Sequence, residues 1–203
     1  MRIPLPKVRE LIEAVRAVVK GPFTTQFPKK VDSVHPNFRG ILKFREEKCI
    51  CCGACVQVCP TDAREIIVDQ EKGVRRNIHH ADRCIYCAQC VLFCPTEAIY
   101  HTPEFDLSRT ERGGWDTTVE KELVYCEICG EPFATKAQLL WIAHKVGDLV
   151  NSNPTLFLTL YQSLGVALPQ EPPFGALPYR SGTMRILCPD CRRKTYMTEE
   201  WGY

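Results

Sequence analysis

The stretch CICCGACVQVCP at residues 49–60 returns as CIYCAQCVLFCP at residues 84–95. In both runs, two residues separate each of the first three cysteines, and a fourth cysteine follows after three more residues, directly before a proline. The similarity continues past the prolines, because PTDA at 60–63 is matched by PTEA at 95–98. The two runs begin 35 residues apart. This repeat predicts two equivalent structural halves.

The spacing of these cysteines is typical of iron–sulfur ligation. Three thiolates on one short loop can reach three corners of a single cubane, while the fourth points elsewhere as the chain turns at the proline. In two-cluster ferredoxins, this fourth cysteine ligates the other cluster. We therefore predict crossed ligation of two [4Fe–4S] clusters. The first takes Cys49, Cys52, Cys55 and Cys94, and the second takes Cys84, Cys87, Cys90 and Cys59.

Zinc and disulfides explain the two runs less well. Zinc sites join pairs of cysteines across a longer loop, and disulfide frameworks are typical of secreted chains. The chain has 13 cysteines and no recognisable signal peptide, so we expect a reducing, cytosolic compartment. Cys51 lies inside the first run but outside its spacing, and we expect it to be a structural thiol.

A second group of cysteines follows towards the C-terminus. Cys126 and Cys129 form one knuckle, and Cys188 and Cys191 form another. Four soft ligands suit a closed tetrahedral zinc site. The Cys-Gly and Cys-Pro-x-Cys flanks also resemble rubredoxin, which keeps a single iron as the alternative.

The insertion between these two knuckles has the pattern of a helical hairpin. Thr135 and Gln138 form a candidate capping box for one helix, and Asn153-Pro154 marks the start of a second. The proline-rich segment at 169–178 is expected to be a loop that returns the chain to the last knuckle.

The N-terminal part is basic and amphipathic. A helix is predicted from about Lys7 to Lys20, because apolar residues recur at helical spacing before Gly21-Pro22. Residues 1–48 carry eleven Lys or Arg and five Asp or Glu, whereas residues 49–179 carry ten and sixteen. We expect the helix to pack on its own chain, on a partner subunit or at a membrane interface.

These signals predict an α+β fold with a ferredoxin domain and a C-terminal four-cysteine domain, of zinc-ribbon or rubredoxin-like type, that carries a helical insertion. Short strands are predicted in and around the ferredoxin repeat, at 41–44, 66–69 and 74–78. The expected parts are an N-terminal helix and arm (1–40), the ferredoxin domain (41–107), a polar linker (108–123) and the four-cysteine ribbon (124–203).

Other residue patterns narrow the range of functions that the sequence indicates. His79-His80 stand in a polar turn and are expected at the surface. We find no nucleophile paired with a base, no phosphate loop and no flavin or nicotinamide fingerprint. No repeated basic groove indicates nucleic acid. No apolar run approaches the roughly 20 residues needed to span a bilayer.

Residues 22–123 resemble the two-cluster ferredoxin subunit of complex I and its hydrogenase relatives. The resemblance rests on the eight cysteines, on NFRG at 37–40 and on PEFDL at 103–107. The resemblance continues into the C-terminal part. There, YCEICGEPFA at 125–134 and CPDCRR at 188–193 resemble the extended form of this subunit found in formate hydrogenlyase complexes. This favours a membrane-bound, energy-converting [NiFe] hydrogenase or a close relative.

The resemblance implies an electron-transfer subunit that is not catalytic by itself. Its partners would be an electron-input subunit and the small and large catalytic subunits, at the cytoplasmic face of the membrane, where partners hold it peripherally. The alternatives are a complex I-like or other substrate-reducing relative, a freely diffusing ferredoxin, and a zinc-ribbon regulator that uses its clusters as sensors. The electron donor, the acceptor and the direction of flow are not indicated by the sequence.

Overall fold

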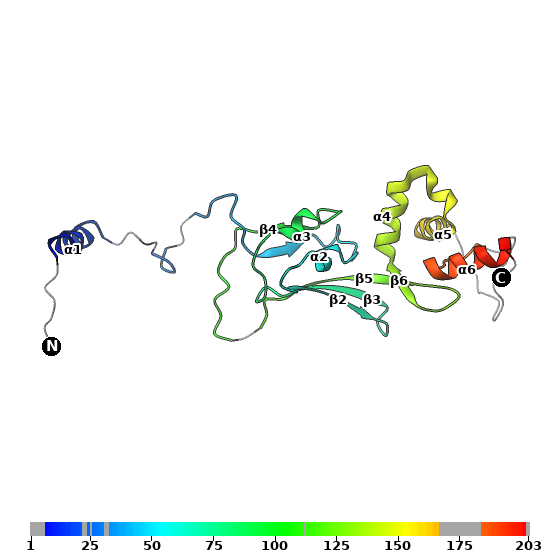
Figure 1. Ribbon diagram of the computed structural model, residues 1–203, viewed down its shortest axis with the longest axis horizontal. Helices are drawn as coiled ribbons and strands as arrows, with labels where there is room; N and C mark the ends of the chain where they lie inside the picture. Colours follow the sequence, from blue (N-terminus) through cyan, green and yellow to red (C-terminus); the bar gives the residue numbers. More distant parts are fainter. Residues whose placement is uncertain are drawn as a thin grey trace. The chain divides into compact units, whose positions relative to one another are not determined.

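The computed structural model describes residues 7–21, 24, 26–30, 33–111, 113–166 and 184–201 (Figure 1). The chain divides into two compact units, Met1–Phe38 and Arg39–Tyr203. The first unit contains helix α1 (Val8–Lys20), which confirms the predicted helix. A backbone φ of +79° at Gly21 follows its last residue. None of its residues is buried, and one face is an exposed apolar stripe that includes Val8, Leu11, Ile12, Val15 and Val19.

The second unit begins with the predicted repeat. Strand β1 (Leu42–Phe44) pairs antiparallel with β4 (Ile99–His101), and β2 (Arg64–Asp69) pairs antiparallel with β3 (Val74–His79). The short helices α2 (Ala54–Gln57) and α3 (Gln89–Leu92) follow the same 35-residue offset. The three predicted strands are therefore confirmed, and the repeat extends from the sequence to the fold.

The cysteine loops of the two halves share their backbone conformation. Positive φ angles occur at three pairs of positions related by the offset: Cys51 and Tyr86, Gly53 and Ala88, Asp62 and Glu97. This left-handed conformation is uncommon outside glycine. Its recurrence on residues with side chains shows that the surrounding structure fixes both loops in one shape.

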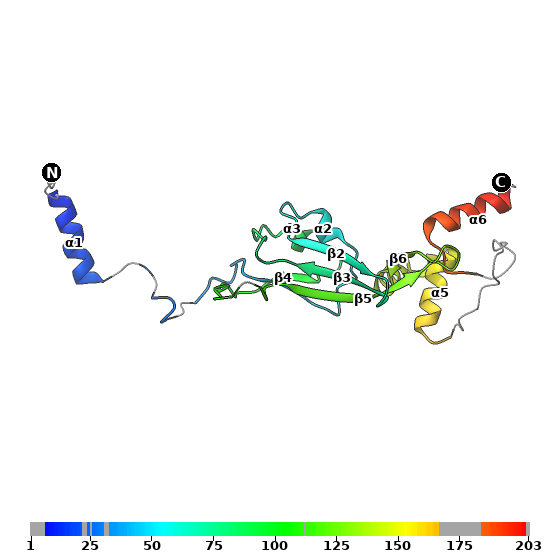
Figure 2. The same ribbon diagram turned by 90° about the horizontal axis from the view of Figure 1, so that it is seen from below.

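Strand β5 (Thr117–Tyr125) corrects the predicted linker at 108–123. It pairs with β3 and with β6 (Pro132–Thr135), giving a four-stranded sheet in the order β2-β3-β5-β6 (Figure 2). Val119 and Leu123 are buried, whereas the intervening Glu120 and Glu122 are exposed. Only part of one face of this strand is covered by other residues, so most of its side chains are polar. Its composition therefore resembles that of a linker.

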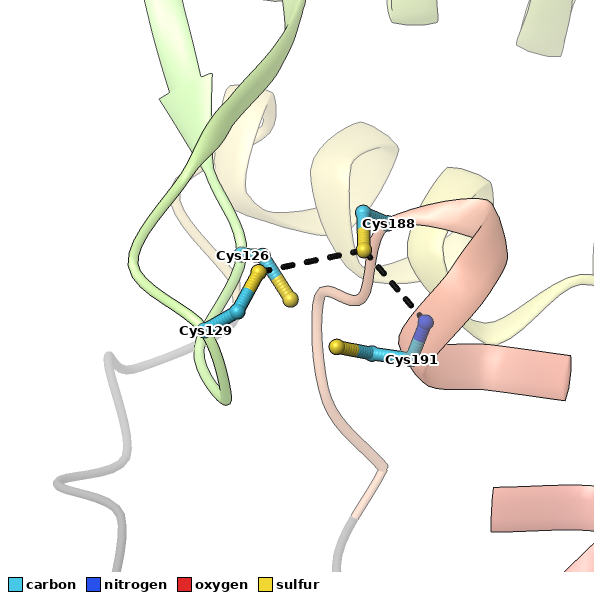
Figure 3. Close-up of side chains that lie close together, drawn as sticks. All are labelled: Cys126, Cys129, Cys188 and Cys191. Carbon is cyan, nitrogen blue, oxygen red and sulfur yellow. Dashed lines mark hydrogen bonds between the residues drawn. The ribbon is translucent and has the colours of Figure 1, made fainter. Parts of the chain in front are cut away.

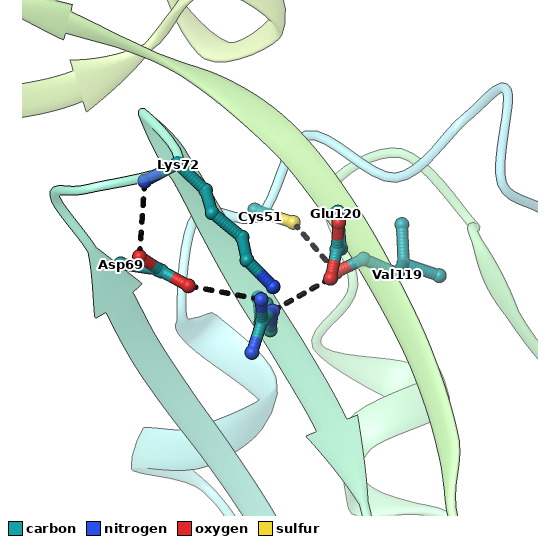
Figure 4. A network of polar contacts seen from close by, with 6 residues as sticks. Cys51, Asp69, Lys72, Val119 and Glu120 are labelled. Carbon is teal, nitrogen blue, oxygen red and sulfur yellow. Dashed lines mark hydrogen bonds and ion pairs between the residues drawn. The ribbon is translucent and has the colours of Figure 1, made fainter.

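Polar contacts connect three strands of this sheet. Arg76 on β3 contacts Asp69 at 2.9 Å and Glu120 on β5 at 2.6 Å. Asp69 also accepts a hydrogen bond from the Lys72 backbone N–H at 3.1 Å (Figure 4). These ion pairs are partly exposed, so we expect each to contribute at most about 1 kcal/mol.

The C-terminal part packs helices on the end of the sheet. Helix α4 (Lys136–Val146), the 3₁₀ helix η1 (Gly147–Ser152) and α5 (Pro154–Ser163) confirm the helical hairpin, and α6 (Pro189–Trp201) begins within the last knuckle. The core of the hairpin contains Ala134, Leu139, Ala143, Val150 and Leu156. The predicted loop at 169–178 lies outside the described residues. Within the described part of the chain, no helix is long and apolar enough to cross a membrane.

Candidate metal centres

Two pockets lie in the ferredoxin repeat, one for each predicted cluster. The lining of the first pocket includes Cys49, Cys52, Cys55 and Cys94. The lining of the second pocket includes Cys59, Cys84, Cys87 and Cys90. Each pocket thus combines three cysteines of one run with the fourth cysteine of the other. The matching linings indicate two spaces of the same kind.

The fourth cysteine of each run is positioned by equivalent hydrogen bonds. The backbone N–H of Ala63 donates to Cys59 Sγ, and that of Ala98 donates to Cys94 Sγ, both at 3.2 Å. The hydroxyls of Thr61 and Thr96 lie 3.8 and 3.7 Å from the same two sulfurs. Burial alone would raise the pKa of Cys59, but its hydrogen bonds lower that pKa below the ordinary value. Such donors stabilise a thiolate and tune a metal bound to it.

Cys51 lies on the wall of the first pocket without matching the ligand spacing. It is 1% exposed, and its thiol donates to the carbonyl of Val119 at 3.7 Å (Figure 4). The hydrogen bond between Cys49 and Cys51 lowers the pKa of Cys49 to about 6 and raises that of Cys51. The buried thiol of Cys51, directed at the Val119 carbonyl, therefore suits a structural role on the pocket wall better than a ligand role.

The environment of Arg64 indicates whether the second pocket can hold an anionic cluster. It is 4% exposed, and its Nη2 donates to Cys90 Sγ at 3.5 Å. Its Nη1 has no hydrogen-bond partner, and no carboxylate among the described residues pairs with it. A buried cation without a counter-charge is strongly unfavourable. A thiolate-ligated iron–sulfur cluster would supply that negative charge. The lining of the second pocket therefore fits such a cluster.

The two histidines before the second run do not behave alike. The expectation that both lie at the surface is wrong for His79, which is fully buried and has no hydrogen-bond partner on either ring nitrogen. Burial, helped by the nearby Arg64 cation, lowers the pKa of His79 to about 4. His80 contacts Glu65 and Asp116, both at 3.1 Å. The polar neighbours of His79 in the sequence concealed its inward position on β3.

The C-terminal cysteines also come together. Cys126 and Cys129 lie on the loop between β5 and β6, while Cys188 and Cys191 lie at the start of α6 (Figure 3). The four sulfurs lie within 4.8 Å of one another, and those of Cys129 and Cys188 are 3.9 Å apart. A tetrahedral zinc with bonds of about 2.3 Å places its sulfurs about 3.8 Å apart. The C-terminal cysteine group therefore has the dimensions of a four-thiolate metal site.

The protonation of this group differs from one cysteine to another. Burial would raise the pKa of Cys126, but backbone hydrogen bonds lower it to about 7. Burial and the neighbouring thiols raise the pKa of Cys191 to about 12. Four such thiols can ionise together only when a cation shares their charge.

Sequence reasoning missed two polar residues on the strands that contact sulfurs of the predicted ligands. These are Arg64, beside Cys90, and Asn77, whose Nδ2 donates to Cys55 Sγ at 3.3 Å. Each lies where the other half of the repeat has an aliphatic residue, Ile99 and Leu42 respectively. Aligning the strands as well as the cysteines at the 35-residue offset would have found both.

Known proteins resemble the chain in the same regions. Residues 48–98 match the 4Fe-4S dicluster domain family. Formate hydrogenlyase subunit 6 of Escherichia coli (strain K12) is 35% identical over 126 residues, which are 62% of this chain and 70% of that protein. NADH-quinone oxidoreductase subunit I of Carboxydothermus hydrogenoformans is 30% identical over 59 residues, which are 29% of this chain and 42% of that protein.

A solved structure is also similar. It is that of the membrane-bound sulfane sulfur reductase, an archaeal respiratory membrane complex, in which one chain is 25% identical with a TM-score of 0.40. The match covers 54% of this chain and 60% of that one. From the extent and identity of the match to the Escherichia coli protein, the chain belongs to the family of formate hydrogenlyase subunit 6.

Proposed function

We propose that this chain is an electron-transfer subunit that holds two [4Fe–4S] clusters and relays electrons within a membrane-bound oxidoreductase complex. The observation that carries the proposal is the pair of pockets, each lined by three cysteines of one run and the fourth cysteine of the other. The match to the dicluster domain and to formate hydrogenlyase subunit 6 supports it. Cys49, Cys52, Cys55 and Cys94 would hold the first cluster, and Cys84, Cys87, Cys90 and Cys59 the second.

The residues around each pocket would bind a cluster, insulate it from water and adjust its reduction potential. When bound, each cluster takes up and releases single electrons. Buried Leu42 and Ile99 keep water from the space around the sulfurs, and the amides of Ala63 and Ala98 stabilise negative charge on Cys59 and Cys94. In this role the chain makes and breaks no substrate bond.

Double variants test the crossed ligand sets directly. Cys52→Ala with Cys94→Ala removes two ligands of one proposed cluster, so we expect four of the eight irons to remain. Cys52→Ala with Cys59→Ala damages both proposed clusters, so we expect nearly all iron and acid-labile sulfide to be lost. The reverse result would show that each run holds its own cluster. The unaltered chain, purified without oxygen, provides the control of eight irons and eight sulfides.

We further propose that the C-terminal cysteine group binds one zinc and fixes the end of the sheet to helix α6. The sulfur separations support a four-thiolate metal site, and a closed set of four soft ligands favours zinc as its occupant. Metal analysis of the unaltered chain distinguishes the two occupants. One zinc with eight irons and eight sulfides is expected, whereas nine irons with eight sulfides and no zinc would replace zinc with a rubredoxin-type iron.

The proposed partners are an electron-input subunit and the small and large catalytic subunits of a hydrogenase or complex I-like assembly, at the cytoplasmic side of the membrane. The exposed apolar stripe of α1 supports a docking role for the N-terminal unit. The test is anaerobic purification of the tagged chain from native membranes in mild detergent. A nickel-bearing large subunit would support a hydrogenase, and the same assembly without nickel would support a complex I-like relative. Recovery of the chain alone from the soluble fraction would contradict the proposal and favour a diffusing ferredoxin.

A further inference from the structure

The repeat allows the two pockets to be compared position by position. At the 35-residue offset, Arg64 on β2 corresponds to Ile99 on β4. The second pocket is lined by Arg64 and the first by Ile99. Both residues open a strand of the same kind, since Arg64 pairs with His79 and Ile99 pairs with Phe44 at corresponding positions. The two pockets thus differ by one buried positive charge at a shared backbone position.

The contacts of Arg64 direct this charge towards the second pocket. Its Nη2 lies 3.5 Å from Cys90 Sγ, and its guanidinium carbon lies 4.7 Å from the ring centroid of Phe44. The aromatic ring and the protein around it exclude water from the cation. Because a charge acts more strongly in a low-dielectric surrounding than in water, Arg64 has a larger effect on its neighbours than an exposed arginine would have.

We propose that Arg64 makes the two clusters unequal by raising the reduction potential of the cluster held by Cys59, Cys84, Cys87 and Cys90. This inference rests on the proposed function. Reduction adds one negative charge to a thiolate-ligated cluster, and a buried cation beside a ligand sulfur stabilises the reduced form more than the oxidised form. Arg64 is a positioning residue in this role, since it acts through Cys90. An electron shared between the two clusters would therefore rest mainly on the second.

Charges and dipoles near the first pocket act in the same direction but less strongly. Asn77 donates to Cys55 Sγ, but it carries no net charge. Arg75 has a buried Nε without a hydrogen-bond partner, but it donates to the carbonyl of Cys51 at 3.4 Å and not to a sulfur, and both Arg75 and Lys121 are partly exposed. Among the described residues, Arg64 is the cation that donates a hydrogen bond to a proposed ligand sulfur. The field of Arg64 also reaches the first pocket, so we expect a smaller shift there.

The test is an anaerobic redox titration of the full chain, followed by electron paramagnetic resonance. Arg64→Gln removes the charge and keeps a polar side chain, whereas Arg64→Lys keeps the charge. Arg39→Gln is the matched control, because Arg39 contacts the carbonyl of Cys87 on the same cysteine loop at 3.4 Å but is exposed. Separate Cys87→Ser and Cys52→Ser variants identify which signal belongs to which cluster.

We expect Arg64→Gln to lower the equilibrium constant for reduction of the second cluster at least tenfold, which corresponds to about 59 mV for one electron. Arg64→Lys and Arg39→Gln should change it less than threefold. In the unaltered chain, the higher potential should belong to the cluster marked by Cys87→Ser, and this order can be read even if Arg64→Gln loses iron. The opposite order, an equal shift of both clusters, or a shift no larger than that of Arg39→Gln would overturn the inference. If the unaltered chain binds no iron and sulfide, the proposed function itself fails.

Discussion

Thr135 joins the C-terminal part to the first cysteine loop, and its loss should be costly. Its side chain is fully buried, donates to the carbonyl of Ile50 at 2.7 Å and accepts from the backbone N–H of Gln138 at 3.2 Å. Thr135→Val keeps the shape and removes both bonds. Loss of the helix cap costs about 1 kcal/mol, and an unsatisfied buried carbonyl costs about 1–3 kcal/mol. We therefore expect a loss of about 2–4 kcal/mol in the free energy of unfolding.

Urea unfolding of the metal-loaded chain, followed by far-ultraviolet circular dichroism without oxygen, measures this loss. Two variants separate the causes. Thr135→Ser keeps the hydroxyl and should recover most of the stability. Asn153→Ala removes only the cap of α5, where Asn153 Oδ1 accepts from Leu156 N at 3.4 Å, and should cost about 1 kcal/mol. The reasoning would be refuted if Thr135→Val cost no more than Asn153→Ala, or if Thr135→Ser were as unstable as Thr135→Val.

Three further outcomes are expected. Cys188→Ser should abolish zinc binding while iron and sulfide stay at eight each, as metal analysis would show; loss of iron without loss of zinc would contradict the assignment. Cys51→Ala should retain eight irons, because Cys51 lies outside the ligand spacing and its thiol donates to the carbonyl of Val119, whereas Cys52→Ala should lose four. The lowered pKa of His79 means that its neutral form is favoured by folding, so its contribution is complete above its ordinary pKa near 6.5 and is lost as pH falls towards 4. When the pH is lowered from 7 to 5, the free energy of unfolding of the unaltered chain should fall by about 2 kcal/mol more than that of His79→Leu, as denaturation at the two pH values would show. Equal losses in the two chains would argue against a buried neutral histidine.

Local sequence patterns predicted the parts of the structure that depend on near neighbours. The cysteine spacing, the apolar periodicity of α1 and the Asn153-Pro154 start of α5 are each complete within a few residues. The capping pattern at Thr135 was predicted in the same way. The second hydrogen bond of Thr135, to Ile50, joins residues that are far apart in the chain, and no local pattern indicates it.

The errors have a common physical cause. Strand β5 and the inward position of His79 are set by pairing between distant strands, in which Asn77 lies opposite Val119 and His79 lies opposite Thr117. A strand that is only half covered keeps charged residues on its open face, so its composition resembles that of a loop. Burial of His79 depends on what packs over β3, which its polar neighbours in the sequence do not reveal.

The two cysteine loops of the repeat differ in their exposure to solvent and in the residues that contact them. Ile50 and Ile85 occupy equivalent positions, yet Ile50 is 7% exposed and Ile85 is 61% exposed. The first loop is held by Thr135, which belongs to β6 and caps α4, so its stability is coupled to the C-terminal part. The second loop is contacted instead by an exposed side chain, that of Arg39 on the carbonyl of Cys87. The two halves of the repeat thus share one framework, but differences at a few positions and the contact with the C-terminal part leave one loop enclosed and the other open.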